Sequence, residues 1–264
     1  MITSASNTRI KKVAALNQKA KERRQEGRYV VEGVKMFLEA PEEEIEEVYV
    51  SEGFHNPACD RKLNGLHAEQ VSEEVFRKMS DTSTPQGILC VMKRKQYTPD
   101  DLLQAATPLL MLLEDIQDPG NLGTILRTGE GAGIDGVVMS RDTADIYNPK
   151  TIRSTMGSIY RVPFLYVSSL SDMIAELKQK KITVYAAHLK GKQWYDQADY
   201  SCGSAFLIGN EGNGLKEETA ALTDYYIKIP MGGKVESLNA AMASGILMYE
   251  ASRQRRFMTD GAKK

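Results

Sequence analysis

The chain has 264 residues, of which 42% are hydrophobic and 26% are charged, and its formal net charge is −1. These values exclude a disordered chain, a collagen and a small disulfide-stabilised protein, and the length predicts one large domain or two modest ones. No apolar run approaches the roughly 20 residues of a membrane helix. The N-terminus has no apolar signal segment, and the three cysteines lack metal-binding spacing. We therefore expect a cytoplasmic protein without a metal and without a membrane.

Charge is distributed unevenly over the first 60 residues. Residues 1–30 carry eight cations and two anions, whereas residues 31–60 carry one cation and nine anions. A basic N-terminal segment often meets a phosphate backbone, which indicates a nucleic-acid partner. On charge alone, a solvated helical face explains the same pattern.

The N-terminal part alternates helices with short strands, a pattern typical of a small α/β domain. Its helices are indicated by apolar residues three and four positions apart, and its strands by short apolar runs. In chain order we predict a helix at 10–20, a strand at 28–32, a helix at 33–40, a strand at 45–50, a helix at 71–79 and a strand at 87–92. We assign residues 1–95 to this first domain and the polar residues 96–107 to a linker.

The remaining residues, 108–264, form the second predicted domain. Its strands are continuous apolar runs separated by helices, which predicts a parallel sheet covered on both faces. In chain order we predict a strand at 108–114, a helix at 122–131, a strand at 136–139, a helix at 168–178, strands at 182–187, 205–208 and 224–229, and a helix at 238–253. The fold class is therefore α/β.

Three glycine-rich segments follow predicted strands of this second domain. The first, residues 118–128, reads Asp-Pro-Gly-Asn-Leu-Gly-Thr-Ile-Leu-Arg-Thr. It places Asn121 at a helix entry, where an asparagine is an ordinary cap, and Arg127 nearly two turns further along the helix. From this segment alone, Arg127 is equally well explained as an exposed surface residue.

The second and third segments also lie at strand ends. Residues 206–215 hold three glycines within six positions, so a ligand can approach the backbone closely, at the sheet edge where open α/β sheets bind ligands. The acid within this segment, Glu211, disfavours a phosphate ligand and favours a cationic or hydroxyl-bearing one. In residues 229–241, a Gly-Gly loop leads to Ser237-Leu238-Asn239 and a helix of small residues. Each segment alone has a structural explanation.

A nicotinamide-binding fingerprint is the main alternative for these glycines. It requires G-x-G-x-x-G between a strand and the helix that follows it. Here Gly129, Gly131 and Gly133 lie at the end of a predicted helix, just before a strand. This position disfavours an oxidoreductase, and the sequence also lacks the metalloprotease, nucleophile-elbow and phosphate-loop motifs.

Taken together, in this order and spacing, the three segments resemble the motifs of the SpoU (TrmH) family of the SPOUT superfamily. Its members are S-adenosylmethionine-dependent RNA ribose 2'-O-methyltransferases. Residues 148–158 are similar to the family's segment between its first and second motifs, and the resemblance spans about residues 108–255. The N-terminal part, residues 1–95, is more loosely similar to the L30e-like substrate-binding domain that often precedes such catalytic domains.

The resemblance implies a trefoil knot in the C-terminal parallel sheet, although knots are rare among protein folds. It also implies that S-adenosyl-L-methionine lies against the second and third loops, in contact with Gly209, Ile229 and Leu238. Family members are typically homodimers that pair through the knotted region. We therefore expect a homodimer.

The reaction implied is attack of a ribose 2'-hydroxyl on a methyl group, so the enzyme must align the partners and ease loss of the hydroxyl proton. By position in the motifs, Arg127 would stabilise developing negative charge, because a guanidinium does not readily lose a proton. Asn121 and Asn239 would orient the ribose or Arg127, and Glu211 would order the loops or Arg127. Ser237 would either cap the last helix or touch the substrate. The identity of the proton acceptor stays open.

The choice between ribosomal and transfer RNA as the substrate depends on the N-terminal domain, which favours ribosomal RNA. The expected phosphate contacts are Lys11, Lys12, Arg23 and Arg24, with Arg153 matching a recurring arginine of the family. A short basic tail keeps a transfer-RNA methyltransferase open as an alternative; it consists of Arg253, Arg255, Arg256, Lys263 and Lys264.

A non-catalytic RNA-binding ribosome-assembly protein on the same fold is the other alternative. The complete polar set of Arg127, Glu211 and Asn239 argues against it, because a protein without activity has no need of all three.

Overall fold

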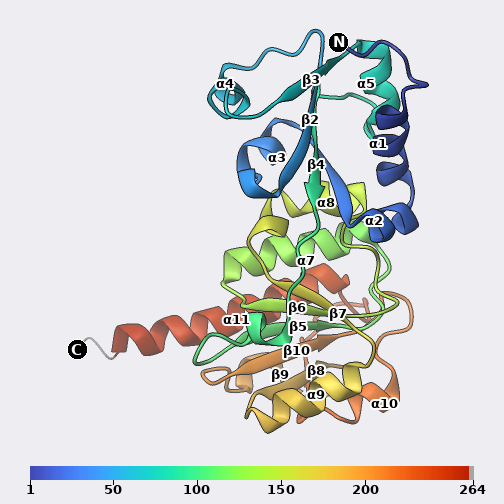
Figure 1. Cartoon of the computed structure of the whole chain (residues 1–264). Coiled ribbons are helices and arrows are strands. Elements are labelled where there is room, and N and C mark those ends of the chain that lie inside the picture. Colours follow the sequence, from blue (N-terminus) through green and yellow to red (C-terminus); the bar gives the residue numbers. More distant parts are fainter. Residues whose placement is uncertain (262–264) are drawn as a thin grey trace. The chain divides into compact units, whose positions relative to one another are not determined.

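The computed structural model describes residues 1–261, with side chains described as far as residue 256. Contacts divide the chain into two compact units (Figure 1). The N-terminal unit comprises residues 1–95 and 145–160, and the C-terminal unit comprises residues 96–144 and the chain from residue 161 onward. These boundaries differ from the expected ones, because helix α6 (Pro99–Leu102) buries Leu102 in the core of the C-terminal unit. The expected linker at 96–107 therefore belongs to that unit.

A four-stranded sheet of order β1-β4-β2-β3 forms the centre of the N-terminal unit. Strands β1 and β2 pair antiparallel with β4, and β2 pairs parallel with β3. Helices α1 and α5 bury their apolar faces on this sheet, so the helical spacing of Ile10, Val13 and Leu16 marks a real core face. The elements are α1 (Thr8–Gln18), α2 (Ala20–Glu26), β1 (Arg28–Glu32), α3 (Val34–Glu39), β2 (Ile45–Ser51), α4 (Pro57–Leu63), β3 (Ala68–Val71), α5 (Glu73–Met79), β4 (Ile88–Lys93) and α8 (Pro149–Thr155).

Arg23 of α2 is buried, which overturns its predicted role as an RNA contact. Its side chain is only 4% exposed, and its Nη2 lies 2.8 Å from Oδ2 of Asp145. Its Nη1 also donates to the carbonyls of Leu16 (2.6 Å) and Asn17 (3.0 Å). Because every one of these acceptors is internal, the guanidinium joins α1, α2 and the 145–160 segment and is not available to a phosphate.

Replacing Arg23 by alanine is expected to lower the free energy of unfolding by about 2–4 kcal/mol. The substitution leaves the Asp145 carboxylate, which is 21% exposed, and two carbonyls without their donor. Urea unfolding followed by circular dichroism measures the change. The control is the exposed Arg24→Ala, which should stay within about 0.5 kcal/mol of the parent. Equal unfolding midpoints for the two variants would contradict this role of Arg23.

The C-terminal unit contains a seven-stranded sheet of order β7-β6-β5-β10-β8-β11-β9, in which every neighbouring pair is parallel. The predicted parallel sheet is thus confirmed. Strands β5 and β10 lie side by side at its centre and are buried along their whole length, as their continuous apolar runs predict. The strands are β5 (Leu109–Leu113), β6 (Gly136–Ser140), β7 (Phe164–Val167), β8 (Thr183–Ala187), β9 (Gln193–Trp194), β10 (Ser204–Ile208) and β11 (Tyr225–Lys228).

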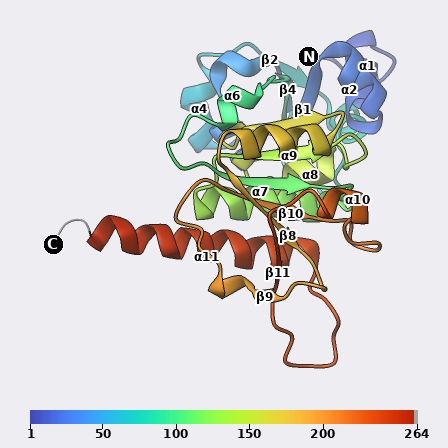
Figure 2. The ribbon, with the colours of Figure 1, turned by 90° about the horizontal axis from the view of Figure 1, so that it is seen from below.

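Helices cover both faces of this sheet (Figures 1 and 2). Helix α9 (Leu170–Gln179) packs its apolar side on β5, β6, β8 and β10. On the other face, α7 (Pro119–Ala132) packs against α11 (Ala240–Gly261), where a Cβ on Gly129 would lie 3.4 Å from Sδ of Met248. The short helix α10 spans Glu217–Ala220. Among residues 1–261, no helix is long and apolar enough to cross a membrane.

Candidate active site

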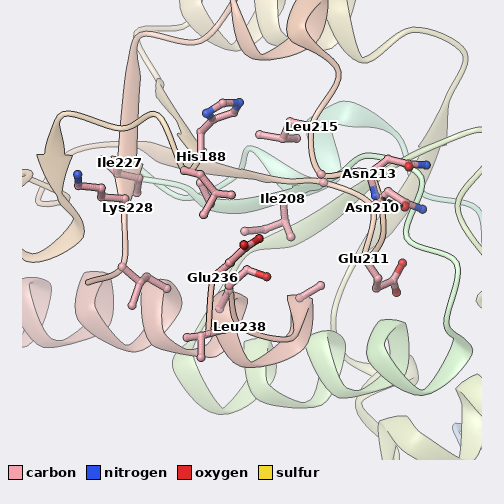
Figure 3. Close-up of a pocket in the computed structure, with 18 of the residues that line it drawn as sticks. His188, Ile208, Asn210, Glu211, Asn213, Leu215, Ile227, Lys228, Glu236 and Leu238 are labelled. Atoms are coloured by element: carbon pink, nitrogen blue, oxygen red, sulfur yellow. Dashed lines mark hydrogen bonds between the residues drawn. The ribbon is translucent and has the colours of Figure 1, made fainter. Parts of the chain in front are cut away.

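A cavity of about 340 Å³ lies at the carboxyl ends of strands β8, β10 and β11 (Figure 3). This is the edge at which open α/β sheets bind ligands, and the volume is within the range typical of small-molecule sites. Its walls are largely apolar and include Ile208, Leu215, Ile227 and Leu247. The second and third glycine-rich segments form much of the remaining lining.

The three residues predicted to contact a cofactor, Gly209, Ile229 and Leu238, all line this cavity. The loop after β10 folds tightly on itself, because Asn210 and Gly214 exchange two backbone hydrogen bonds of 3.1 and 2.9 Å. Gly209 has to be glycine here, since a Cβ would lie 2.3 Å from the carbonyl carbon of Gly214. The sequence therefore favours a compact loop whose main chain faces the cavity.

A chain of amide and carboxylate side chains joins the three glycine-rich segments. Nδ2 of Asn239 donates to Oδ1 of Asn121 at 2.9 Å, and Nδ2 of Asn121 donates to Oε1 of Glu211 at 2.9 Å. Each residue comes from a different segment, so the cluster fixes the three loops to one another beside the cavity. We call these three residues the polar cluster.

Glu211 also accepts hydrogen bonds from two backbone amides, those of Gln117 at 3.0 Å and Asp118 at 3.1 Å. Partial burial alone would raise the pKa of this carboxyl, but the hydrogen bonds from Asn121 and the two amides favour the charged form and lower the pKa below its ordinary value. Glu211 is thus a carboxylate at neutral pH and acts as the acceptor that orders the start of α7.

The helix caps differ from those predicted. Asp118 caps α7, with Pro119 in the first turn, and its Oδ1 accepts from the amide of Asn121 at 2.8 Å. Asn121 is therefore inside the helix, and its side chain is committed to the polar cluster. At α11, Oδ1 of Asn239 accepts from the amide of Ala241 at 2.9 Å, so Asn239 caps this helix and the expected capping role of Ser237 is wrong. Ser237 lines the cavity instead.

Arg127 lies on α7 with its side chain exposed, outside the lining of the cavity. Among the described residues it makes no hydrogen bond and no ion pair, so the polar cluster does not orient it by direct contact. An exposed, unpaired guanidinium is suited to bidentate recognition of phosphate or of developing charge on oxygen.

Glu236 and Lys228 also line the cavity, and neither was predicted from the sequence. Nζ of Lys228 lies 4.4 Å from the centroid of the Trp194 ring. In the sequence, Glu236 lies between the Gly-Gly loop and Ser237-Leu238-Asn239. An acidic residue inside this ligand-binding segment is the feature from which Glu236 could have been predicted.

The remaining predicted RNA contacts belong to the N-terminal unit. Lys11, Lys12 and Arg24 are exposed on α1 and α2. Arg153 on α8 is 38% exposed, and its Nη1 lies 2.9 Å from Oδ2 of Asp81. Three of these four cations are thus available to a phosphate directly, whereas Arg153 has an anionic competitor within its own unit.

The donor set of the cavity fits an organic cation with an aromatic part. Apolar walls suit a flat ring, the main chain of two loops offers hydrogen-bonding groups, and the carboxylates of Glu211 and Glu236 suit positive charge. In the part of the chain that the structure describes, no group of three His, Cys, Asp or Glu side chains is arranged to hold a metal ion.

A parallel α/β sheet with such a cavity at its carboxyl edge is typical of proteins that bind a small organic ligand. The SpoU rRNA Methylase family matches residues 108–249, and an MRM3-like substrate binding domain matches residues 7–90. The chain therefore belongs to the SpoU rRNA methylase family, as the motifs predicted. Membership confirms an RNA 2'-O-methyltransferase with S-adenosylmethionine as its cofactor.

Individual proteins agree with this assignment along nearly the whole chain. The chain is 35% identical to the 23S rRNA (guanosine(2553)-2'-O)-methyltransferase RlmP of Bacillus subtilis, over 94% of this chain and 97% of the relative. The structure of the SpoU methyltransferase AviRb from Streptomyces viridochromogenes in complex with AdoMet covers 95% of this chain and 98% of its own, with 26% identity and a TM-score of 0.86. An AdoMet-bound rRNA methyltransferase from Sinorhizobium meliloti gives 29% identity and a TM-score of 0.82, covering 96% and 97%.

Proposed function

We propose that the protein methylates a ribose 2'-hydroxyl of ribosomal RNA with S-adenosylmethionine. The observation that carries the proposal is the polar cluster, because Asn121, Glu211 and Asn239 join all three motif segments beside the cavity. A merely structural sheet edge does not require two amides and a carboxylate in series. The names of the relatives as 23S rRNA or rRNA methyltransferases support the choice of RNA.

Each predicted site residue has a role in this proposal. Gly209, Ile229 and Leu238 hold the cofactor, which when bound supplies an activated methyl on a sulfonium. Arg127 binds RNA phosphate or stabilises charge on the ribose oxygen, and it keeps its own proton. The polar cluster keeps the cofactor loops and the start of α7 in one arrangement. This reduces the reorganisation that substrate alignment requires.

Ser237 is assigned to the substrate side of the cavity, since it does not cap α11. Ser237 lines the cavity and stands in the sequence between Glu236 and Leu238, which also line it. A hydroxyl there can donate to or accept from a ribose.

For RNA recognition we propose that Lys11, Lys12 and Arg24 contact phosphates, and that Arg153 exchanges Asp81 for a phosphate on binding. The family match of residues 7–90 to a substrate-binding domain supports this use of the N-terminal unit. The basic tail gives little support to a transfer-RNA substrate. Arg255 donates to the carbonyls of Thr107 and Cys202, and Lys263 and Lys264 lie outside the described residues.

We also propose a homodimer formed through a knotted C-terminal unit. Met242 and Tyr249, seven residues apart and thus on one side of α11, are 60% and 50% exposed, and apolar side chains of this size suit an interface. A cytoplasmic location is supported by three free cysteines, Cys59, Cys90 and Cys202.

Transfer of labelled methyl from S-adenosylmethionine to unmodified ribosomal and transfer RNA tests the proposal. Alkali does not cleave next to a 2'-O-methyl ribose, so we expect labelled alkali-resistant dinucleotides from ribosomal RNA. Label in transfer RNA instead would keep the chemistry and overturn the substrate. No label in any RNA, including intact ribosomal particles, together with no detectable cofactor binding would favour a non-catalytic assembly protein.

A further inference from the structure

Two carboxylates line the cavity, and they are in different situations. Glu211 accepts three hydrogen bonds and belongs to the polar cluster. Glu236 makes no hydrogen bond and no ion pair among the described residues. Figure 3 shows Glu236 between Ile208 and Leu238, whereas Glu211 lies to one side, near Asn210. Glu236 is therefore the carboxylate that the protein leaves free to meet a ligand.

No cation of the cavity neutralises Glu236. Lys228 lines the same cavity, but its ammonium lies over the Trp194 ring at 4.4 Å and forms no ion pair with Glu236. Nδ1 of His188 accepts from the amide of Lys190 at 3.1 Å, so this ring is also engaged within its own loop. Glu236 is an exposed carboxylate at the cavity lining without a cation partner among the described residues, so it can attract a positively charged ligand group.

We propose that Glu236 determines cofactor specificity by favouring the cationic cofactor over its demethylated product. This inference rests on the proposed function. S-adenosylmethionine carries two positive groups, a sulfonium and an ammonium, and one negative group, its own carboxylate. The product has a neutral thioether in place of the sulfonium. The two ligands share the adenosine and the amino acid, so the sulfonium charge is the difference that Glu236 can sense.

This selection has a consequence for turnover. Glu236 is exposed, so a ligand bound beside it would displace part of the water around the carboxylate, and the attraction of the carboxylate to positive charge would then be screened less. Loss of the methyl group removes one positive charge from the ligand and leaves the carboxylate without that partner. Glu236 therefore weakens product binding relative to cofactor binding and favours exchange of the spent ligand.

Calorimetric titration of the full-length protein with S-adenosylmethionine and with S-adenosylhomocysteine tests this role. For Glu236→Gln, which keeps the shape and removes the charge, we expect the affinity for S-adenosylmethionine to fall about 5- to 10-fold. The affinity for S-adenosylhomocysteine should change less than about twofold. Sinefungin, whose amine replaces the methylated sulfonium and stays charged, should follow S-adenosylmethionine.

The matched control is Glu217→Gln, which removes one negative charge from α10 outside the cavity lining. Glu217 is exposed and pairs with Lys190, so this variant should leave the ratio of the two affinities unchanged. Raising the salt concentration should reduce the ratio in the parent protein but not in Glu236→Gln.

Three results would overturn the inference. Equal weakening of both ligands by Glu236→Gln would show that the residue shapes the loop and does not sense charge. Unchanged affinities would show that it has no role in binding. If the parent protein binds neither ligand, the proposed function fails together with this inference. In the first two results the parent protein still binds the cofactor, so only the role of Glu236 fails.

Discussion

Arg127→Ala is expected to reduce methyl transfer to RNA by about 100-fold or more while leaving S-adenosylmethionine binding within about twofold of the parent. The reason is the position of Arg127, which lies on α7 outside the cavity lining and has no partner among the described residues. Its loss therefore removes a donor from the RNA side of the site and disturbs neither the cavity nor the fold. Single-turnover methylation measures the first effect, and calorimetry with the cofactor measures the second.

Two further variants separate charge from geometry at Arg127. Arg127→Lys keeps the positive charge without the planar fork, so it should recover part of the activity and remain about 10-fold below the parent. Lys180→Ala, which removes an exposed cation at the end of α9, should leave the rate unchanged. Full activity in Arg127→Ala would remove this residue from the mechanism.

Much of the fold follows from local patterns of the sequence. Residues 28–32 form β1 with the predicted bounds, and the buried runs of β5 and β10 are visible as continuous apolar residues. Helix α4 (Pro57–Leu63) and strand β7 (Phe164–Val167) were not predicted. Both elements are short, with seven and four residues.

The partners of single side chains were harder to predict than the elements. Arg23 stands among exposed cations in the sequence, and its burial depends on Asp145, which is 122 residues away. The basic stretch predicted four RNA contacts, and the structure shows that three of these side chains are exposed and that Arg23 is buried. The cap of α7 was misassigned because Asn121 was preferred to Asp118, although the Asp-Pro pair is the stronger start signal.

The candidate site was visible in the sequence only through the resemblance of its motifs. Asn121 and Glu211 are 90 residues apart and Asn121 and Asn239 are 118 residues apart, so no local pattern places them in contact. Strands β10, β8 and β11 are neighbours in the sheet and run parallel, so their carboxyl ends lie at one edge, where the cavity forms. Glu236 lies within the third segment, but the sequence does not show that this carboxylate has no hydrogen bond or ion pair among the described residues.

Gly209→Ala is expected to lower the affinity for S-adenosylmethionine by at least about tenfold, because the loop cannot accept a side chain. The new Cβ would lie 2.3 Å from the carbonyl carbon of Gly214 and 2.4 Å from the amide nitrogen of Leu215. Both atoms belong to the main chain, so no rotamer change relieves the contact. The loop has to open, which breaks the paired backbone hydrogen bonds between Asn210 and Gly214.

The parallel sheet itself should persist in this variant, since the clash is confined to the loop after β10. We expect an unchanged far-ultraviolet spectrum and a loss of about 1–3 kcal/mol in the free energy of unfolding. The control is Gly232→Ala in the third glycine-rich segment, where a Cβ meets no atom within 4 Å and the affinity should stay within about twofold. Unchanged cofactor affinity in Gly209→Ala would show that the compact form of the loop is not what binds the cofactor. Equal losses in both variants would instead point to a general need for flexibility in the glycine-rich loops.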